Sequence, residues 1–553
     1  MLKRLDKLEL ALITALFVSL LASLHLALFQ KINWDEFYYL SQVHDYARGT
    51  FSTALQTIHI HFWQPLTRTS LNEVDQVIVG RMAMWLCLVG TVGAIYAIAR
   101  TFFTRSAALF AGLVYLSFNY TLIHGTSFRT DPPAAFLIMV CLVIALRARL
   151  GIGAILVFSL CAAFAALTTV KVVFYLPAFL AAIIWRLSGP ENPLQVFAKI
   201  GVMLVLSLLL CVGVYLWHQG TLTGADLSGS QSMLSNAAST TLIPTNLFPR
   251  MPYLLVNMAD SLVPTMILWA SLPILALKGP QISGSWRAVI VVLGLALPLA
   301  TFAVYRNAFP YFFPFIFPPA MVLCAAVFEG VKTRRSIAVA LIILCLVTTT
   351  MSWVTRLGSA KTDQRDILAA VHTAFPDPVA YFDRSGAIAR FPKAGFFMST
   401  WGVLNYRNAG VPVLEQALEA QVVPLLLLNN PQLSHAVATS GSTIVSPLFE
   451  QDRNALSNNF IPHWGPIWVA GKTVDLTGTA QTIDVHIPGI YTLEASGPVL
   501  VNGSQVAPKD QVTLKRGQTT LNAVTPQSVT LRWGKHLARP SRPAPSATFF
   551  TDF

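Results

Sequence analysis

Apolar runs long enough to cross a membrane recur along the first two thirds of the chain. Residues 8–29 are almost entirely apolar, and about 20 helical residues span the roughly 30 Å hydrocarbon core of a bilayer. The predicted spans are 8–29, 79–99, 106–124, 132–146, 152–170, 172–185, 200–217, 251–277, 287–304, 309–328 and 336–354. We therefore predict a polytopic α-helical membrane protein with about eleven or more transmembrane helices.

Basic residues lie in every second connection between these spans. Lys3 and Arg4 precede the first span, and Arg147 and Arg149 follow the fourth. Short basic connections are typical of the cytoplasmic side of a membrane. We therefore expect a cytoplasmic N-terminus and an exported region after residue 355.

The hydrophobic pattern changes after the last span. Residues 356–470 mix helical periodicity with short buried runs such as 425–428, which favours a small α/β domain. Residues 471–537 alternate apolar and polar positions between Pro-Gly and Asn-Gly turns, a pattern typical of a small β-sandwich. Residues 538–553, rich in proline and arginine, are predicted to form a tail.

Two long outward loops interrupt the predicted membrane domain, residues 1–355. The loop 30–78 contains a pattern that predicts an amphipathic helix, whose apolar residues, including Leu40 and Val43, we expect to face lipid. The loop 218–250 is rich in Ser, Thr, Gly and Asn. This composition suits a flexible flap over a site, and equally an inert flexible loop.

The composition agrees with a membrane protein. Hydrophobic residues make up 54% of the chain and charged residues 11%, with a mean hydropathy of +0.59. These values exclude an ordinary soluble protein. The formal net charge of +13 does not indicate a nucleic-acid partner, because the basic residues form short clusters between the apolar runs, as determinants of topology do.

Two adjacent carboxylates, Asp35 and Glu36, follow the first span at the point where it leaves the membrane. A charge within the bilayer costs roughly 2.5–3.5 kcal/mol on insertion scales, so acids close to the membrane are candidates for function. The alternative is that the two carboxylates only mark the membrane boundary.

A third acid and three cations share the same predicted outer side. Asp131 and Arg129 lie between the third and fourth spans, Lys171 follows the fifth, and Arg306 follows the ninth. Asp131 precedes two prolines and could cap a helix. As an alternative to a role in a site, each cation could extend its charged end to the membrane–water interface. The combination suggests instead a site that receives an anion and activates a hydroxyl, with a carboxylate as general base and the cations on a departing phosphate.

The first loop also contains His59 and His61, with His44 nearby. Two histidines separated by one residue share one side of a strand, so they are candidate ligands for a divalent metal such as Mg²⁺ or Mn²⁺. Surface histidines are common, and no cofactor is required by the pattern.

Four features together resemble the GT-C membrane glycosyltransferases, in the branch that includes protein O-mannosyltransferases and the lipid A aminoarabinose transferase. The features are Trp34-Asp35-Glu36, Arg129-Thr130-Asp131-Pro132, Leu167–Lys171, and Tyr305-Arg306 with the aromatic, proline-rich run 311–319. Their order, spacing and predicted side match this branch across roughly residues 1–360.

The resemblance implies inverting-type transfer of a sugar from a polyprenyl-phosphate donor to a hydroxyl at the outer face of a bacterial inner membrane. It implies that Asp35 is the catalytic base and that Glu36 and Asp131 orient the acceptor or support a loop. Arg129, Lys171 and Arg306 are then candidates for the donor phosphate. The implied acceptor is an envelope glycolipid such as lipopolysaccharide, a glycan or a protein, and the exported region would be periplasmic.

Two other classes of protein compete with this interpretation. A transporter or flippase of a lipid-linked glycan would also be polytopic, but transporters place polar residues near the midplane and often contain repeats. A membrane receptor whose β-sandwich binds glycan would leave the outward acids and cations unexplained.

Overall fold

The computed structural model describes residues 6–223, 247–357, 362–437, 446–545 and 549. These residues form two compact units. The first unit comprises Met1–Gln30, Tyr46–Pro65 and Ile78–Ser359, and the second comprises Lys31–Asp45, Leu66–Val77 and Ala360–Phe553. Residues 224–246 of the predicted flexible loop, and 546–548 and 550–553 of the predicted tail, lie outside the described part of the chain.

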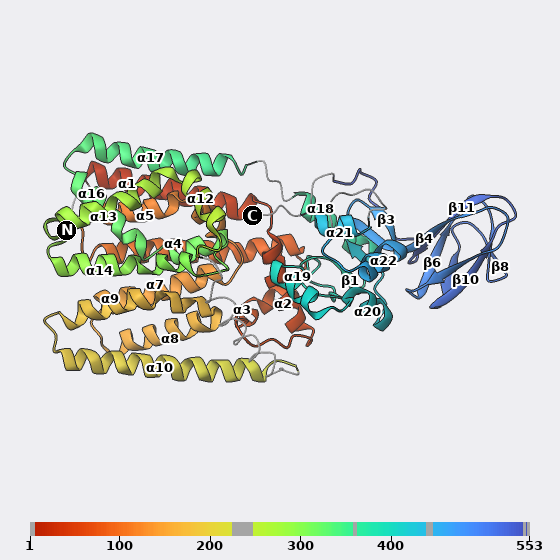
Figure 1. The fold of residues 1–553 in the computed structure, drawn as a ribbon, viewed down its shortest axis with the longest axis horizontal. Coiled ribbons are helices and arrows are strands. Elements are labelled where there is room, and N and C mark those ends of the chain that lie inside the picture. Colours follow the sequence, from red (N-terminus) through yellow and green to blue (C-terminus); the bar gives the residue numbers. More distant parts are fainter. Residues whose placement is uncertain (1–5, 224–246, 358–361, 438–445, 546–548, 550–553) are drawn as a thin grey trace. The chain divides into compact units, whose positions relative to one another are not determined.

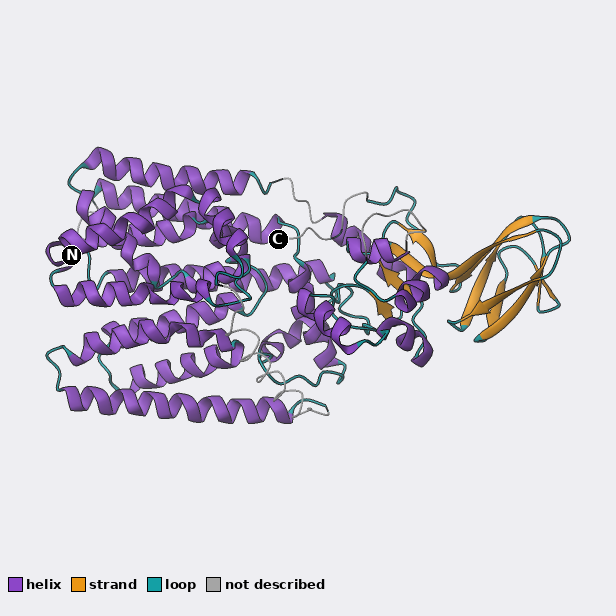
Figure 2. Cartoon of the chain, viewed as in Figure 1, coloured by secondary structure: helices purple, strands orange, loops and turns teal. Residues whose placement is uncertain are grey.

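The first unit is helical (Figures 1 and 2). Its longer helices are α1 (Lys7–Phe29), α4 (Glu73–Ala99, which begins in the second unit), α5 (Arg105–Ser117), α7 (Asp131–Arg147), α8 (Ile152–Thr168), α9 (Leu176–Leu187), α10 (Pro193–Gly220), α12 (Met251–Asp260), α13 (Leu262–Ser283), α14 (Trp286–Ala296) and α17 (Arg335–Val354). Shorter pieces are α3 (His59–Trp63), η1 (Gln64–Arg68, shared with the second unit), α6 (Asn119–His124), η2 (Val170–Tyr175), η3 (Leu297–Ala303), η4 (Pro310–Phe312), α15 (Phe313–Ile316), η5 (Ala320–Leu323) and α16 (Cys324–Val331). Each predicted span therefore has a helical counterpart.

Seven helical segments among the described residues are long and apolar enough to cross a membrane. An eighth is added if the helical pair Pro310–Ile316 and Ala320–Val331, bent by 61°, forms one span. Two prolines, Pro318 and Pro319, lie at this bend, where each removes a backbone donor and disfavours a straight helix. The chain is a multi-pass membrane protein, as its hydropathy predicts.

The second unit contains all the strands of the described residues (Figure 2). Its helices are α2 (Trp34–Ala47, which ends in the first unit), α18 (Thr362–Ala374), α19 (Thr400–Ala409), α20 (Val413–Ala420), α21 (Pro431–Val437) and α22 (Glu450–Asn459). Its strands are β1 (Tyr381–Phe382), β2 (Leu425–Leu427), β3 (Phe460–Trp464), β4 (Ile467–Leu476), β5 (Gln481–Val485), β6 (Gly489–Glu494), β7 (Val499–Val501), β8 (Ser504–Val506), β9 (Gln511–Leu514), β10 (Gly517–Asn522) and β11 (Gln527–Trp533).

Strand β4 connects the two halves of the larger sheet in this unit. Its first half pairs with β2, with Val469 opposite Leu425, and its second half pairs with β11, with Thr473 opposite Thr530. One sheet therefore runs in the order β1-β2-β4-β11-β6-β9, and a second sheet runs β5-β10-β7-β8. The predicted domain boundary between residues 470 and 471 falls inside β4, and the domain limits proposed from the sequence remain predictions.

Helix α2 is the predicted amphipathic helix, but its apolar face is not turned to lipid. Leu40 and Val43 are fully buried. Phe37 packs on Phe549 with ring centroids 5.9 Å apart, and the ring of Tyr38 stacks on Phe397 at 4.0 Å. The expectation of lipid contact is wrong because the second unit, which includes α2, supplies its own apolar cover for this face.

Candidate functional site

The acids and cations predicted from the sequence form two groups, which lie in separate units. In the first unit, two helical elements and the bend before one of them bring together a carboxylate and two cations. Asp131 is the first residue of α7, Arg129 lies in the turn before it, and Lys171 lies in η2. All three side chains are largely buried, with 2%, 6% and 12% exposure for Asp131, Arg129 and Lys171.

Asp131 is the common partner of the two cations. Its Oδ2 lies 3.4 Å from Arg129 Nε, and its Oδ1 accepts from Lys171 Nζ. The carboxylate therefore pairs with cations, and the capping alternative is not needed to explain it. One carboxylate between two buried cations leaves the group with a net positive charge, which suits an anionic ligand.

An aromatic ring completes this group. The guanidinium of Arg129 lies 3.6 Å from the centroid of the Tyr311 ring, and Lys171 Nζ lies 5.5 Å from the same centroid. Both distances permit attraction between cation and ring. Tyr311 belongs to the aromatic run that the sequence singles out. Its proximity to both cations could be seen only in the structure.

Gln56, in the first loop, is hydrogen-bonded to the turn that carries Lys171. The hydroxyl of Thr169 accepts from the backbone amide of Lys171 and donates to Gln56 Oε1, which also accepts from Val170 N at 3.2 Å. Gln56 adopts a positive φ of 62°. No motif in the sequence indicated this residue.

Arg306 is placed next to a further cation. Its backbone carbonyl accepts from Arg250 Nε at 3.0 Å, and the Arg250 guanidinium lies 4.2 Å from the Phe309 ring centroid. Arg250 was not predicted as a site residue, although it is the last residue of the outward loop that the sequence marks. The phosphate contact of Arg306 stays a prediction.

In the second unit, Asp35 and Glu36 form the first turn of α2. Asn33 Oδ1 accepts from the Asp35 amide at 3.0 Å, and Glu36 Oε2 accepts from the Asn33 amide at 2.9 Å. This reciprocal pattern is a capping box, in which each side chain satisfies an otherwise unpaired backbone donor. Glu36 is fully buried and Asp35 is 7% exposed. The Asn-x-x-Glu spacing could have identified this cap from the sequence.

The histidine pair does not have the predicted geometry. His59 and His61 lie on α3, and residues two apart on a helix point to widely separated directions, unlike those on a strand. His61 Nε2 instead lies 2.7 Å from Nδ1 of His218. Among the described residues, no group of three or more His, Cys, Asp or Glu side chains could hold a metal ion.

An apolar cavity of about 550 Å³ begins beside Lys171. Helices α7, α8, α9 and α10 surround it and lie side by side in the first unit (Figure 1). Val172 and Val173, which directly follow Lys171, line the cavity with Ile138, Phe158, Phe179 and Met203, and its polar lining residues are Arg186 and Ser207. Its volume lies in the range of ligand-binding pockets.

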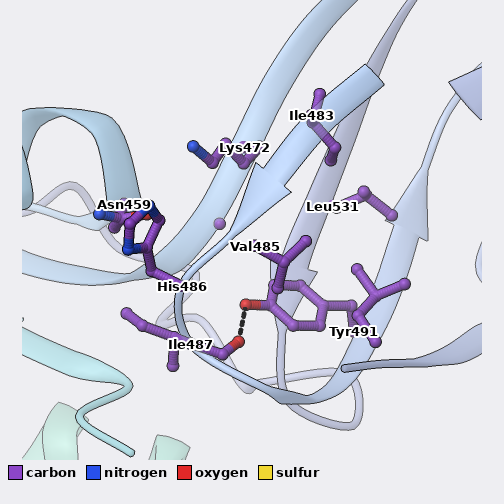
Figure 3. Close-up of a pocket in the computed structure, with 10 residues that line it drawn as sticks. Asn459, Lys472, Ile483, Val485, His486, Ile487, Tyr491 and Leu531 are labelled. Carbon is purple, nitrogen blue, oxygen red and sulfur yellow. Dashed lines mark hydrogen bonds between the residues drawn. The ribbon is translucent and has the colours of Figure 1, made fainter. Parts of the chain in front are cut away.

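A small cavity lies at the edge of the terminal sandwich (Figure 3). Asn459, Lys472 and His486 lie around it with Val485 and Tyr491. The Tyr491 hydroxyl donates to the Ile487 carbonyl across it. The volume of about 10 Å³ admits at most one water molecule, so this cavity holds no sugar.

Comparisons with known proteins identify the fold. No protein-family model matches the chain, and no curated protein matches its sequence. Among solved structures, ArnT from Cupriavidus metallidurans bound to undecaprenyl phosphate is similar, with a TM-score of 0.51, 13% identity, and coverage of 78% of this chain and 95% of ArnT. The oligosaccharyltransferase AglB from Archaeoglobus fulgidus, in complex with an inhibitory peptide and a dolichol-phosphate, gives a TM-score of 0.52 at 9% identity and covers 94% of this chain and 95% of AglB.

Both of these proteins are GT-C glycosyltransferases. At such low identity the likeness establishes the fold, and the prediction of a GT-C fold with a C-terminal region that contains β-sheet is confirmed.

Proposed function

We propose that this GT-C-fold chain transfers a sugar from a polyprenyl-phosphate donor to a hydroxyl acceptor at the outer face of a bacterial inner membrane. The acceptor would be an envelope glycolipid, a glycan or a protein. The general reaction is supported by two structural neighbours, since ArnT was solved with undecaprenyl phosphate and AglB with a dolichol-phosphate.

The observation that carries this proposal is the position of Lys171. Its ammonium belongs to the buried cationic group with Arg129 and Asp131, and the two residues after it line the apolar cavity. A ligand that matches both features has an anionic head and a long apolar tail. A phosphate joined to a polyprenyl chain has this chemistry, and a soluble nucleotide sugar lacks the tail.

The proposed reaction is a single displacement at the anomeric carbon of the donor sugar. Asp35 accepts the proton of the acceptor hydroxyl, and the hydroxyl oxygen forms a bond to the anomeric carbon. The bond from that carbon to the phosphate oxygen breaks, and the phosphate leaves with the electron pair. General-base catalysis of this kind contributes about 10²–10⁴-fold to the rate.

The other residues have supporting roles in this proposal. Arg129 and Lys171 neutralise the departing phosphate, where charge develops in the transition state, and Arg306 remains a candidate for the same task. Asp131 orients the two cations. Glu36 keeps the first turn of α2 closed through the cap that it forms with Asn33.

The test is turnover by the purified full chain in lipid vesicles. We would supply a panel of polyprenyl-phosphate sugars with cell-envelope extract as acceptor, add Mg²⁺ or Mn²⁺ in parallel, and measure release of free polyprenyl phosphate. We expect release by the wild type and a loss of at least 100-fold in Asp35→Asn.

Two results would contradict the proposal. Release that is unaffected by Asp35→Asn would remove the proposed base. Movement of the intact lipid-linked donor across the vesicle membrane, without release of polyprenyl phosphate, would identify a flippase instead.

A further inference from the structure

We propose that Gln364, on α18 of the exported region, is a positioning residue that holds the first turn of α2 and thereby Asp35. The inference rests on the proposed role of Asp35 as general base. It assigns to the exported region a part in catalysis rather than in recognition of glycan alone.

The side-chain amide of Gln364 bonds to both backbone groups of Ile32. Its Oε1 accepts from the Ile32 amide at 2.8 Å, and its Nε2 donates to the Ile32 carbonyl at 2.9 Å and to the Phe549 carbonyl at 2.8 Å. Gln364 is fully buried and Ile32 is 1% exposed. Both backbone groups of Ile32 would otherwise lie buried without these partners, which is costly.

Ile32 directly precedes the cap of α2. Asn33 holds the Asp35 amide, and Glu36 holds the Asn33 amide. The contacts therefore form a continuous series from Gln364 through Ile32 and Asn33 to Asp35. A displacement of Ile32 moves the cap, and the cap sets the direction of the first turn of the helix.

The rest of α2 is held by the same unit. Phe37 contacts Phe549, Tyr38 stacks on Phe397, and Leu40 and Val43 are fully buried. The chain between α1 and α2 is only four residues long, from Gln30 to Asn33. The Gln364 bonds hold this short segment at Ile32, three residues before the carboxylate of Asp35.

A positioning residue affects the rate of the chemical step more than donor binding. A misplacement of about 1 Å at a reacting group costs up to about 10²-fold in rate. The proposed phosphate ligands Arg129 and Lys171 belong to the first unit, whereas Gln364 belongs to the second. We therefore expect a fall in kcat with little change in the donor KM.

The experiment compares Gln364→Met with Tyr406→Phe in the reconstituted full chain. Methionine keeps the length of glutamine and removes all three hydrogen bonds. The control removes a buried hydroxyl in the same unit, where Tyr406 donates to Asp452 Oδ2 and accepts from the Phe449 amide, both at 2.7 Å. Turnover, thermal unfolding and hydrogen exchange of the amides of residues 35–37 would be measured for both variants.

We expect Gln364→Met to lower kcat about 10- to 100-fold, to change the donor KM by less than about twofold, and to accelerate exchange at residues 35–37. Tyr406→Phe should lower the unfolding temperature with near-normal turnover of the folded protein. Equal turnover in the two variants, at temperatures where both are folded, would overturn the positioning role while the proposed function stands.

The two proposals fail in different ways. If the wild type releases no polyprenyl phosphate from any donor, the proposed function fails. Hydrogen exchange then still decides the structural part of the inference: accelerated exchange at residues 35–37 in Gln364→Met alone supports it, and unchanged exchange overturns it.

Discussion

At the scale of single residues, Asp131 is a buried carboxylate that pairs with two cations. It contacts Arg129 and Lys171, and Tyr311 packs against Arg129. Burial of unpaired charge is expensive, so two buried cations require a counter-charge. Asp131 supplies that charge and sets the direction of both side chains.

Asp131→Asn should therefore destabilise the protein by about 3–5 kcal/mol, since it removes the charged carboxylate that both buried cations contact. Asp6→Asn is the matched control. Asp6 lies 4.0 Å from Arg335, and the two side chains are 70% and 60% exposed, so loss of this pair should cost about 0–1 kcal/mol. Denaturant unfolding in detergent would measure both variants.

The double variant Asp131→Asn/Lys171→Met should recover part of the lost stability, because it also removes the buried ammonium that has lost its carboxylate. A free energy of unfolding for Asp131→Asn that equals that of Asp6→Asn would show that the three charges are not coupled as described.

At the scale of elements, helices α8 and α10 form part of the wall of the apolar cavity. Phe158 and Ala162 of α8 line it together with Met203 and Ser207 of α10. Helix α10 is apolar over its length, and only 6% of its membrane window is buried. It therefore acts as an outer wall between the cavity and the surrounding lipid.

Ser207→Trp should obstruct a polyprenyl tail, because Ser207 faces the cavity. Leu208→Trp is the control, since Leu208 is the next residue and is 64% exposed on the lipid side. Loss of contact with two methylene groups costs about 1.6 kcal/mol, so we expect the KM for a long-chain donor to rise at least about tenfold in Ser207→Trp.

A donor with a short chain should be used equally well by both tryptophan variants. An unchanged KM for the long-chain donor in Ser207→Trp would show that the tail does not occupy this cavity.

At the scale of the whole molecule, the C-terminal region forms one unit with two segments of the first loop. The second unit includes Lys31–Asp45 and Leu66–Val77 from the first loop. The first of these segments contains Asp35. In the second, Glu73 Oε2 lies 2.9 Å from His372 Nε2 on α18, and Asp75 pairs with Arg365 of the same helix. Parts of the chain that are distant in sequence thus build one unit.

A chain that ends at Leu357 should retain the predicted spans and Asp35 yet lose turnover by at least about 100-fold, because the buried face of α2 loses its cover. Release of polyprenyl phosphate would measure turnover, and limited proteolysis within residues 34–47 should become rapid. Wild-type turnover in the shortened chain would contradict the dependence of α2 on the C-terminal region.

The elements were largely predictable from the sequence, and some features of the site were as well. Long apolar runs must form helices in lipid because every backbone group needs a partner there, so the predicted spans have helical counterparts. The Asn33–Glu36 cap depends on residues in one turn and was also readable from spacing. The lipid-facing assignment of Leu40 and Val43 failed because hydrophobicity alone does not distinguish a lipid contact from a protein contact.

The sequence by itself determined the spans, the strands and the candidate charged residues, because these depend on local composition and period. Only the tertiary structure decided which charges meet. Asp131 and its partner Lys171 are 40 residues apart, and Tyr311 comes from a third, proline-bent segment. Likewise, only the structure assigned Asp35 to the second unit and showed that Gln364 bonds to Ile32, just before α2. Such contacts depend on how distant helices pack, and no local pattern in the chain encodes that packing directly.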